Sequence, residues 1–167
     1  ILKYFPTYGE SGNYTAYDAE GKEVLLETNE KETLSAQVFK TIVDPFVGRI
    51  SYLKVLSGVL GSDSTVYNAN KDKAEKITSV FIIKGKHQTA AGKLFTGDIG
   101  AVVKLQYTQT NDTLCDKSRP VKARPIEFSE PMFAQAVFPK SKNDEDKLSN
   151  ALQRMAEEDQ TLRIVNN

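Results

Sequence analysis

The sequence predicts a mainly β protein, with a small closed β-barrel followed by a short α/β segment. Between residues 34 and 116, short stretches rich in Val, Ile, Tyr and Phe alternate with Gly, Ser, Asn and Asp turn signals, which is typical of a barrel. After residue 140 the apolar spacing changes to that of an amphipathic helix. A chain of 167 residues fits one domain, or one complete domain and part of another.

The first 33 residues are acidic and rich in loop formers. They hold few basic side chains, and "YGESGNYTAYDAEGKEV" has the Gly, Ser and Asn content of connecting segments. We interpret residues 1–33 as a connector with one short strand near residues 24–27. The acidic residues are Glu10, Asp18, Glu20, Glu23, Glu27, Glu30 and Glu32.

Residues 34–120 contain the strands of the predicted barrel. In "RISYLKVLSG", Leu53 and Val55 alternate with Tyr52, so the strand has one apolar face. Gly58 and Gly61 are expected to bracket a turn that uses positive φ. Strands are predicted over residues 34–42, 49–58, 65–69, 75–85 and 97–105.

Residues 121–167 have a different character. Prolines at positions 120, 125, 131 and 139 punctuate an extended lead-in, a strand is predicted over residues 132–138, and "NDEDKLSNALQRMAEED" has helical periodicity. Ser141 or Asn143 is expected to cap this helix. "TLRIVNN" begins a further strand, so the segment predicts an incomplete α/β domain and the chain a fragment of a longer protein. The apolar face of the helix comprises Leu148, Ala151, Leu152, Met155 and Ala156.

No catalytic, cofactor or metal site is expected in this chain. One Cys and one His do not provide a zinc site, and no window matches the phosphate-binding G-x-x-x-x-G-K-[ST] pattern. We interpret Cys115 as a small buried hydrophobic residue and His87 as an ordinary loop residue. No apolar run approaches the roughly 20 residues of a membrane span, and a reducing, cytoplasmic setting fits the single cysteine.

A local excess of lysines lies between residues 71 and 86, although the formal net charge of the whole chain is zero. Asp72 and Glu75 are the acids within this stretch, so its net charge is positive. Such a patch is suited to phosphates, but a solubilising barrel rim is the alternative. The lysines are Lys71, Lys73, Lys76, Lys84 and Lys86.

Several segments resemble the bacterial elongation factor G family. They include "QVFKTIVDPFVGRISYLKVLSGVL", "VYNANKDKAEKI", "TGDIGAVVKL", "NDTLCD" and "EFSEPMFAQAVFPKSKNDEDKLSNALQRMAEED", in order from about residue 33 to 164. The resemblance implies that residues 1–33 are the tail of a GTPase domain and a connector. It implies further that residues 34–120 are the second domain, a translation-factor β-barrel, and that residues 121–167 begin a ferredoxin-like third domain. Asn111 stands where the family usually has Gly, and Asn tolerates the left-handed conformation.

The resemblance also implies an indirect role in GTP hydrolysis. An absent amino-terminal domain would bind GTP and Mg²⁺, while the barrel contacts that domain and small-subunit ribosomal RNA during translocation, with no membrane partner. The lysine patch is then an expected rRNA contact. The turn "DPFVGR" is an expected contact with the GTPase domain, through Asp44, Pro45, Gly48 and Arg49. A ribosomal-protection-type or other paralogue, and a free-standing RNA-binding barrel, are the alternatives; a small enzyme is disfavoured because no catalytic motif is found.

Overall fold

The computed structural model describes residues 4, 6–10, 12–85 and 87–165. The chain divides into two compact units, residues 1–125 and 126–167, and each is described by itself. All helices and strands of the first unit are β-strands, and the second carries the one long helix of the described residues, so the predicted mainly β class is confirmed. No helix of the described residues is long and apolar enough to cross a membrane.

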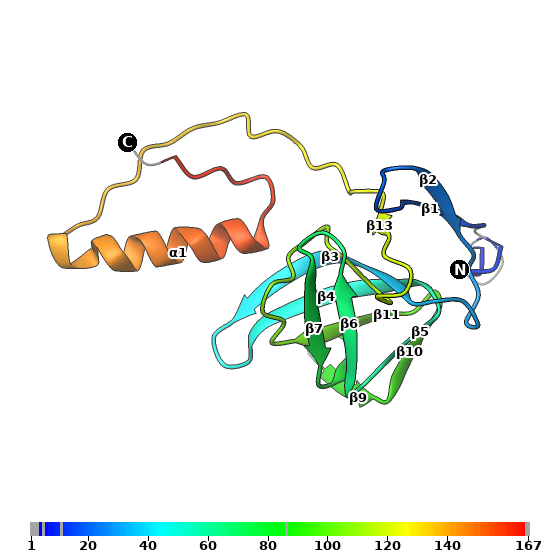
Figure 1. The fold of residues 1–167 in the computed structure, drawn as a ribbon. Helices are drawn as coiled ribbons and strands as arrows, with labels where there is room; N and C mark the ends of the chain where they lie inside the picture. The colour runs from blue at the N-terminus through cyan, green and yellow to red at the C-terminus, as the bar shows by residue number, and fades with distance from the viewer. Residues whose placement is uncertain (1–3, 5, 11, 86, 166–167) are drawn as a thin grey trace. The chain divides into compact units, whose positions relative to one another are not determined.

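An eight-stranded sheet in the order β7-β6-β12-β3-β4-β11-β8-β9 forms the barrel (Figure 1). The predicted strands at 34–42 and 49–58 are the two longest, β3 and β4, which form a tight antiparallel hairpin. The sheet strands are β3 (Ser35–Asp44), β4 (Gly48–Ser57), β6 (Ser64–Asn68), β7 (Lys73–Ile77), β8 (Val80–Lys84), β9 (His87–Ala91), β11 (Ile99–Val103) and β12 (Thr113–Cys115).

Two sequence predictions within the barrel are wrong. The strand predicted over residues 75–85 is two strands, because β7 pairs with β6 whereas β8 pairs with β11 and β9. Gly58 has the predicted positive φ, of 70°, but Gly61 ends a strand, β5 (Val59–Gly61), which pairs with β10 (Lys93–Phe95). Local turn signals are present at both glycines, and only the long-range partner distinguishes strand from turn.

The barrel core is aliphatic. Leu53 and Val55 lie inside it, as the alternation of β4 predicts, while Tyr52 stays half-buried and packs against Phe39. The cluster comprises Ala36, Val38, Leu53, Val55, Leu60, Val66, Ile77, Val80, Leu94, Val102, Leu105 and Leu114. Burial of these side chains is the main stabilising term for such a domain.

A second, three-stranded sheet joins the two ends of the first compact unit. Its order is β13-β1-β2, with β1 (Tyr14–Tyr17) between β2 (Glu23–Leu26) and β13 (Lys122–Ala123). The strand predicted near residues 24–27 is therefore present as β2. A small core of Ala16, Leu26, Leu56, Cys115, Val121 and Ala123 lies between this sheet and the barrel. Segments from the two ends of this unit, residues 14–26 and 122–123, thus meet on one sheet.

The second compact unit contains the 3₁₀ helix η1 (Lys142–Asp144) and α1 (Glu145–Glu158). The predicted strand over residues 132–138 is wrong, because that segment is extended and unpaired, and residues 161–165 form no strand either. Of the two predicted caps, Ser141 is the N-cap residue of η1, which runs directly into α1, but it makes no capping side-chain bond. Asn143 caps neither helix: Asp144 precedes α1, also without a capping bond, and the Ser141 hydroxyl donates to its carboxylate at 2.7 Å. The sequence places the start of the helix too early because η1 extends its polar, acidic run.

Candidate nucleic-acid and interdomain interface

The tip of the β3–β4 hairpin is a rigid three-residue loop. The Asp44 carboxylate accepts hydrogen bonds from the backbone N–H groups of Phe46 and Val47, both at 2.8 Å, and these bonds lower its pKa. Gly48 has the predicted positive φ, of 84°. Phe46 is 96% exposed at the apex. The "DPFVGR" sequence therefore presents an aromatic ring on a fixed backbone.

Arg49 lies at the base of the same hairpin and faces a loop that the sequence patterns do not single out. Its carbonyl accepts a hydrogen bond from Lys104 N at 3.0 Å, and its Nη1 donates to the Gln106 carbonyl at 3.4 Å. These bonds join the hairpin to residues 104–112, which connect β11 to β12.

The structure places the candidate lysines on two separate hairpins. Lys71, Lys73 and Lys76 are exposed on the β6–β7 hairpin, whereas Lys84 is exposed at the end of β8. β6 and β7 pair with each other and not with β8, so the four described lysines do not share one sheet edge. Lys86 lies outside the described residues.

Glu75 does not neutralise these lysines at the surface. It is 3% exposed, and its carboxylate accepts bonds from the backbone N–H groups of Gln106, Tyr107 and Thr108 at 3.1, 2.7 and 2.9 Å. The Thr108 hydroxyl donates to it as well, at 2.9 Å. The sequence carries one signal for this burial, since Glu75 occupies the same face of β7 as the buried Ile77.

A second buried carboxylate completes the support of the loop. Asp112 is 5% exposed and accepts hydrogen bonds from the Asn68 side-chain amide and from Gln109 N, both at 2.9 Å. Asn68 also donates to Thr108 at 3.0 Å. Asn111, in the position where the family usually has Gly, adopts φ of 76°, which confirms that the turn survives this replacement.

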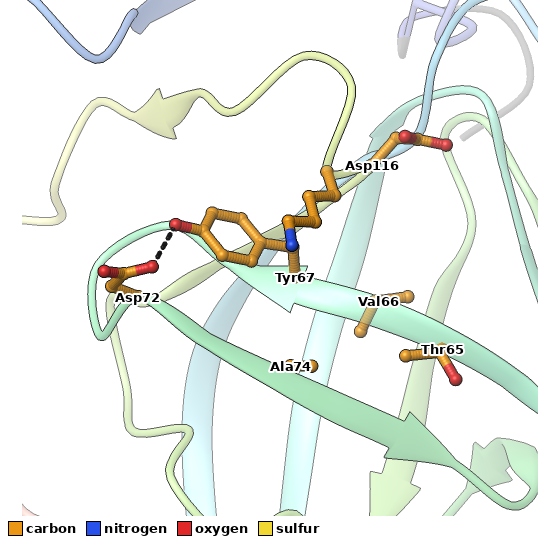
Figure 2. A pocket seen from close by; sticks show the side chains of 7 residues that line it. Thr65, Val66, Tyr67, Asp72, Ala74 and Asp116 are labelled. Atoms are coloured by element: carbon orange, nitrogen blue, oxygen red, sulfur yellow. Dashed lines mark hydrogen bonds between the residues drawn. The ribbon is translucent and has the colours of Figure 1, made fainter.

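A shallow hollow of about 270 Å³ lies on the outer face of β6 and β7, lined in part by Thr65, Tyr67 and Ala74 (Figure 2). The Tyr67 hydroxyl donates to Asp72 across it at 2.6 Å, and this bond raises the pKa of the phenol. With this bond the Tyr67 and Asp72 side chains satisfy each other across the hollow.

Cys115 and His87 both lie in strands of the barrel. Cys115 is fully buried, and burial raises the pKa of its thiol, so its interpretation as a small core residue is confirmed. His87 is exposed, but it begins β9 opposite Lys84 rather than lying in a loop, which corrects the prediction. No group of three or more His, Cys, Asp or Glu residues in the described part of the chain could hold a metal ion.

Comparisons with known proteins define the class to which this barrel and its extension belong. Residues 33–117 match the family model of Elongation factor G domain 2, and residues 128–167 match that of Elongation Factor G, domain III. A solved structure from Thermus thermophilus superposes with a TM-score of 0.71 and 25% identity, covering 80% of this chain and 20% of that one. These are domains of a translational GTPase.

The chain belongs to the elongation factor G family. It is 38% identical over its whole length to Elongation factor G of Chlamydia trachomatis serovar D, and equally so to that of serovar A. It spans 24% of the length of these relatives. The family that the sequence motifs indicated is therefore confirmed.

Proposed function

We propose that this chain is the non-catalytic barrel and third-domain portion of a cytoplasmic elongation-factor-G-like translational GTPase. The observation that carries the proposal is the pair of adjacent family matches, to domain 2 and domain III, over most of the chain. In this proposal residues 1–33 connect to the GTPase domain, residues 34–120 are domain II and residues 121–167 begin domain III. GTP and Mg²⁺ bind in the GTPase domain of the parent.

The barrel acts as a rigid body that contacts the GTPase domain on one side and small-subunit rRNA on another. The interdomain contact is made by the β3–β4 hairpin, through Asp44, Pro45, Gly48 and Arg49. The hydrogen bonds to the Asp44 carboxylate fix the backbone of this hairpin, which suits it to such a contact. A rigid element can transmit the state of the nucleotide only if its contacts differ between the two states. The β3–β4 hairpin and the three-stranded sheet β13-β1-β2 are two places where such contacts can change.

The exposed lysines contact rRNA. The principal group comprises Lys71, Lys73 and Lys76, since they share one hairpin, and Lys84 lies at the end of β8. Lys86 is included in the proposed contact on its sequence position alone. Because Glu75 is buried, the charged side chains exposed on this hairpin are the three lysines and Asp72. Ribosome protection by a paralogue, and RNA binding by a free barrel, are the alternative functions.

The first test is GTP hydrolysis by the full-length parent with and without 70S ribosomes. Strong stimulation by ribosomes supports the proposal, and bound nucleotide without stimulation contradicts it. The second test is charge reversal at Lys71, Lys73 and Lys76, compared with Lys93→Glu on the exposed side of β10. We expect weaker ribosome binding and a smaller salt dependence for the triple variant alone. Equal binding by both variants would remove this hairpin from the contact.

A further inference from the structure

The loop that joins β11 to β12 presents polar and aromatic side chains outward. Lys104, Gln106, Tyr107 and Gln109 are exposed, whereas Leu105, Thr108 and Thr110 are buried. Tyr107 is 47% exposed. A tyrosine ring held at the surface between cationic and amide side chains has the composition of a stacking platform for nucleic-acid bases.

Cations from three chain segments converge on this loop. Lys71 Nζ donates to Gln109 Oε1 at 2.9 Å, and Arg49 Nη1 donates to the Gln106 carbonyl at 3.4 Å. Lys104 is itself part of the loop, and its N–H donates to the Arg49 carbonyl. We name this surface, formed by residues 104–109 with Arg49 and Lys71, the loop end of the barrel.

The nearby carboxylates are withdrawn from the loop end or already engaged. Glu75 and Asp112 are buried and satisfied by N–H groups of the loop itself. Asp44 caps its own hairpin, and Asp72 accepts the Tyr67 hydroxyl. The carboxylates keep their charge, but the charged side chains that reach the surface of the loop end itself are the cations Lys71 and Lys104, which can contact a polyanion directly.

The loop is also preorganised. Three consecutive N–H groups are fixed on Glu75, and Lys104 adopts a positive φ of 62°. A side chain on a fixed backbone loses less conformational entropy when it binds. The backbone that carries Tyr107 is therefore fixed before any partner arrives.

We propose that the loop end binds an unpaired segment of RNA, with Tyr107 stacking on one base and Lys71 and Lys104 contacting its phosphates. The inference rests on the proposed function and names the kind of RNA and the residues. Unpaired RNA is favoured because only a splayed base exposes a face to an aromatic ring, whereas a duplex shows mainly its backbone and minor groove. A protein partner is disfavoured, because the loop end offers one half-exposed ring amid charged and amide groups rather than an apolar centre.

The test is binding of the 167-residue chain to two fluorescein-labelled RNAs: a hairpin with an unpaired loop and a blunt duplex of equal length. We expect the wild-type chain to prefer the hairpin. Tyr107→Ser should lower hairpin affinity about tenfold or more and leave duplex affinity unchanged, since one stacked base is lost. Tyr107→Phe keeps the ring and should bind as the wild type does.

The lysines are tested by Lys71→Gln combined with Lys104→Asn, since Asn tolerates the positive φ at position 104. This variant should weaken binding to both RNAs and reduce the salt slope by about one for each phosphate that is no longer neutralised. The matched control is Lys22→Gln combined with Lys93→Gln, because both lysines are exposed elsewhere on the chain. This control should change neither RNA binding nor the salt slope. Circular dichroism verifies that each variant is folded.

An unchanged hairpin-to-duplex ratio in Tyr107→Ser, or an equal effect of the control pair, would overturn the inference, as would no detectable hairpin binding. The proposed function is tested separately by ribosome-stimulated GTP hydrolysis of the parent. If ribosomes stimulate GTP hydrolysis but Tyr107→Ser does not change RNA binding, only the proposal for the loop end is refuted. If RNA binding depends on Tyr107 but ribosomes do not stimulate GTP hydrolysis, the proposal for the loop end is supported and only the translational role is refuted.

Discussion

The two compact units match neighbouring domains of one family, yet they are stabilised in different ways. Residues 1–125 contain every buried hydrophobic side chain of the described chain, and most of them form two clusters. In residues 126–165 no described side chain is buried, and Met132 and Phe133 are 99% and 84% exposed. A family match over a segment therefore does not ensure that the segment has a core of its own. The first unit depends on long-range burial, and the second on contacts within α1 and its flanks.

The largest expected effect contrasts a core leucine with a helix leucine. Leu53 is fully buried in the barrel, so Leu53→Ala should lower the free energy of unfolding by about 3 kcal/mol. Leu152 is half-buried on α1, and Leu152→Ala should change the free energy of unfolding by less than about 0.5 kcal/mol. Urea unfolding followed by circular dichroism measures both. Equal losses would show that α1 packs into the cooperative unit.

A proline in α1 tests the same contrast between the two units by disrupting the helix instead of the barrel core. Ala151→Pro removes a helical hydrogen bond and should destabilise α1 by about 3 kcal/mol. The helical circular dichroism signal should fall, because an isolated helix shorter than ~15 residues is marginal. The thermal midpoint of the barrel should stay constant, because no side chain of α1 is buried. Ala151→Ser, on the same exposed position, is the control and should keep most of the helix. A lowered barrel midpoint in the proline variant would break the comparison.

A buried carboxylate in the first unit and an exposed one in the second extend the comparison to polar side chains. Glu75→Gln leaves the bonds from the 106–108 backbone poorly matched and should cost about 2 kcal/mol, since Glu75 is a buried charged acceptor. Glu130 forms an ion pair with Arg163 in the second unit, with both side chains largely exposed. Glu130→Gln should therefore cost less than ~0.5 kcal/mol. Hydrogen exchange at Tyr107 and Thr108 should accelerate in Glu75→Gln only, and unchanged protection would contradict the role of Glu75.

The smallest expected effect is a pH dependence shared by both units. Hydrogen bonds from Val47 and Phe46 lower the pKa of Asp44, and bonds from Ser141 and Lys147 lower that of Asp144. Since each folded pKa lies below the ordinary value of 3.8, the stabilisation is present above that value and is lost as the pH falls through the folded pKa. Carboxyl NMR titration should show that Ser141→Ala raises the pKa of Asp144 and leaves that of Asp44 unchanged. Movement of both would contradict local causes.

Much of the barrel was predictable because its signals are local. The β3–β4 hairpin follows from alternation around Leu53 and from Gly48, and the burial of Cys115 follows from its apolar surroundings. The candidate site was predictable only in part. The lysines were visible as charges, but their distribution over two hairpins depends on which strands pair.

The sequence by itself determined the family, the mainly β class and the conformations at Gly48 and Asn111, because motifs, alternation and turn chemistry are encoded within a few residues. The tertiary structure alone decided the break between β7 and β8, the pairing of β13 with β1 and the inward position of Glu75. Each of these depends on groups far away in the chain that satisfy a backbone or bury a side chain. For the same reason the loop end, which joins Arg49, Lys71 and residues 104–109, is visible only in the folded chain.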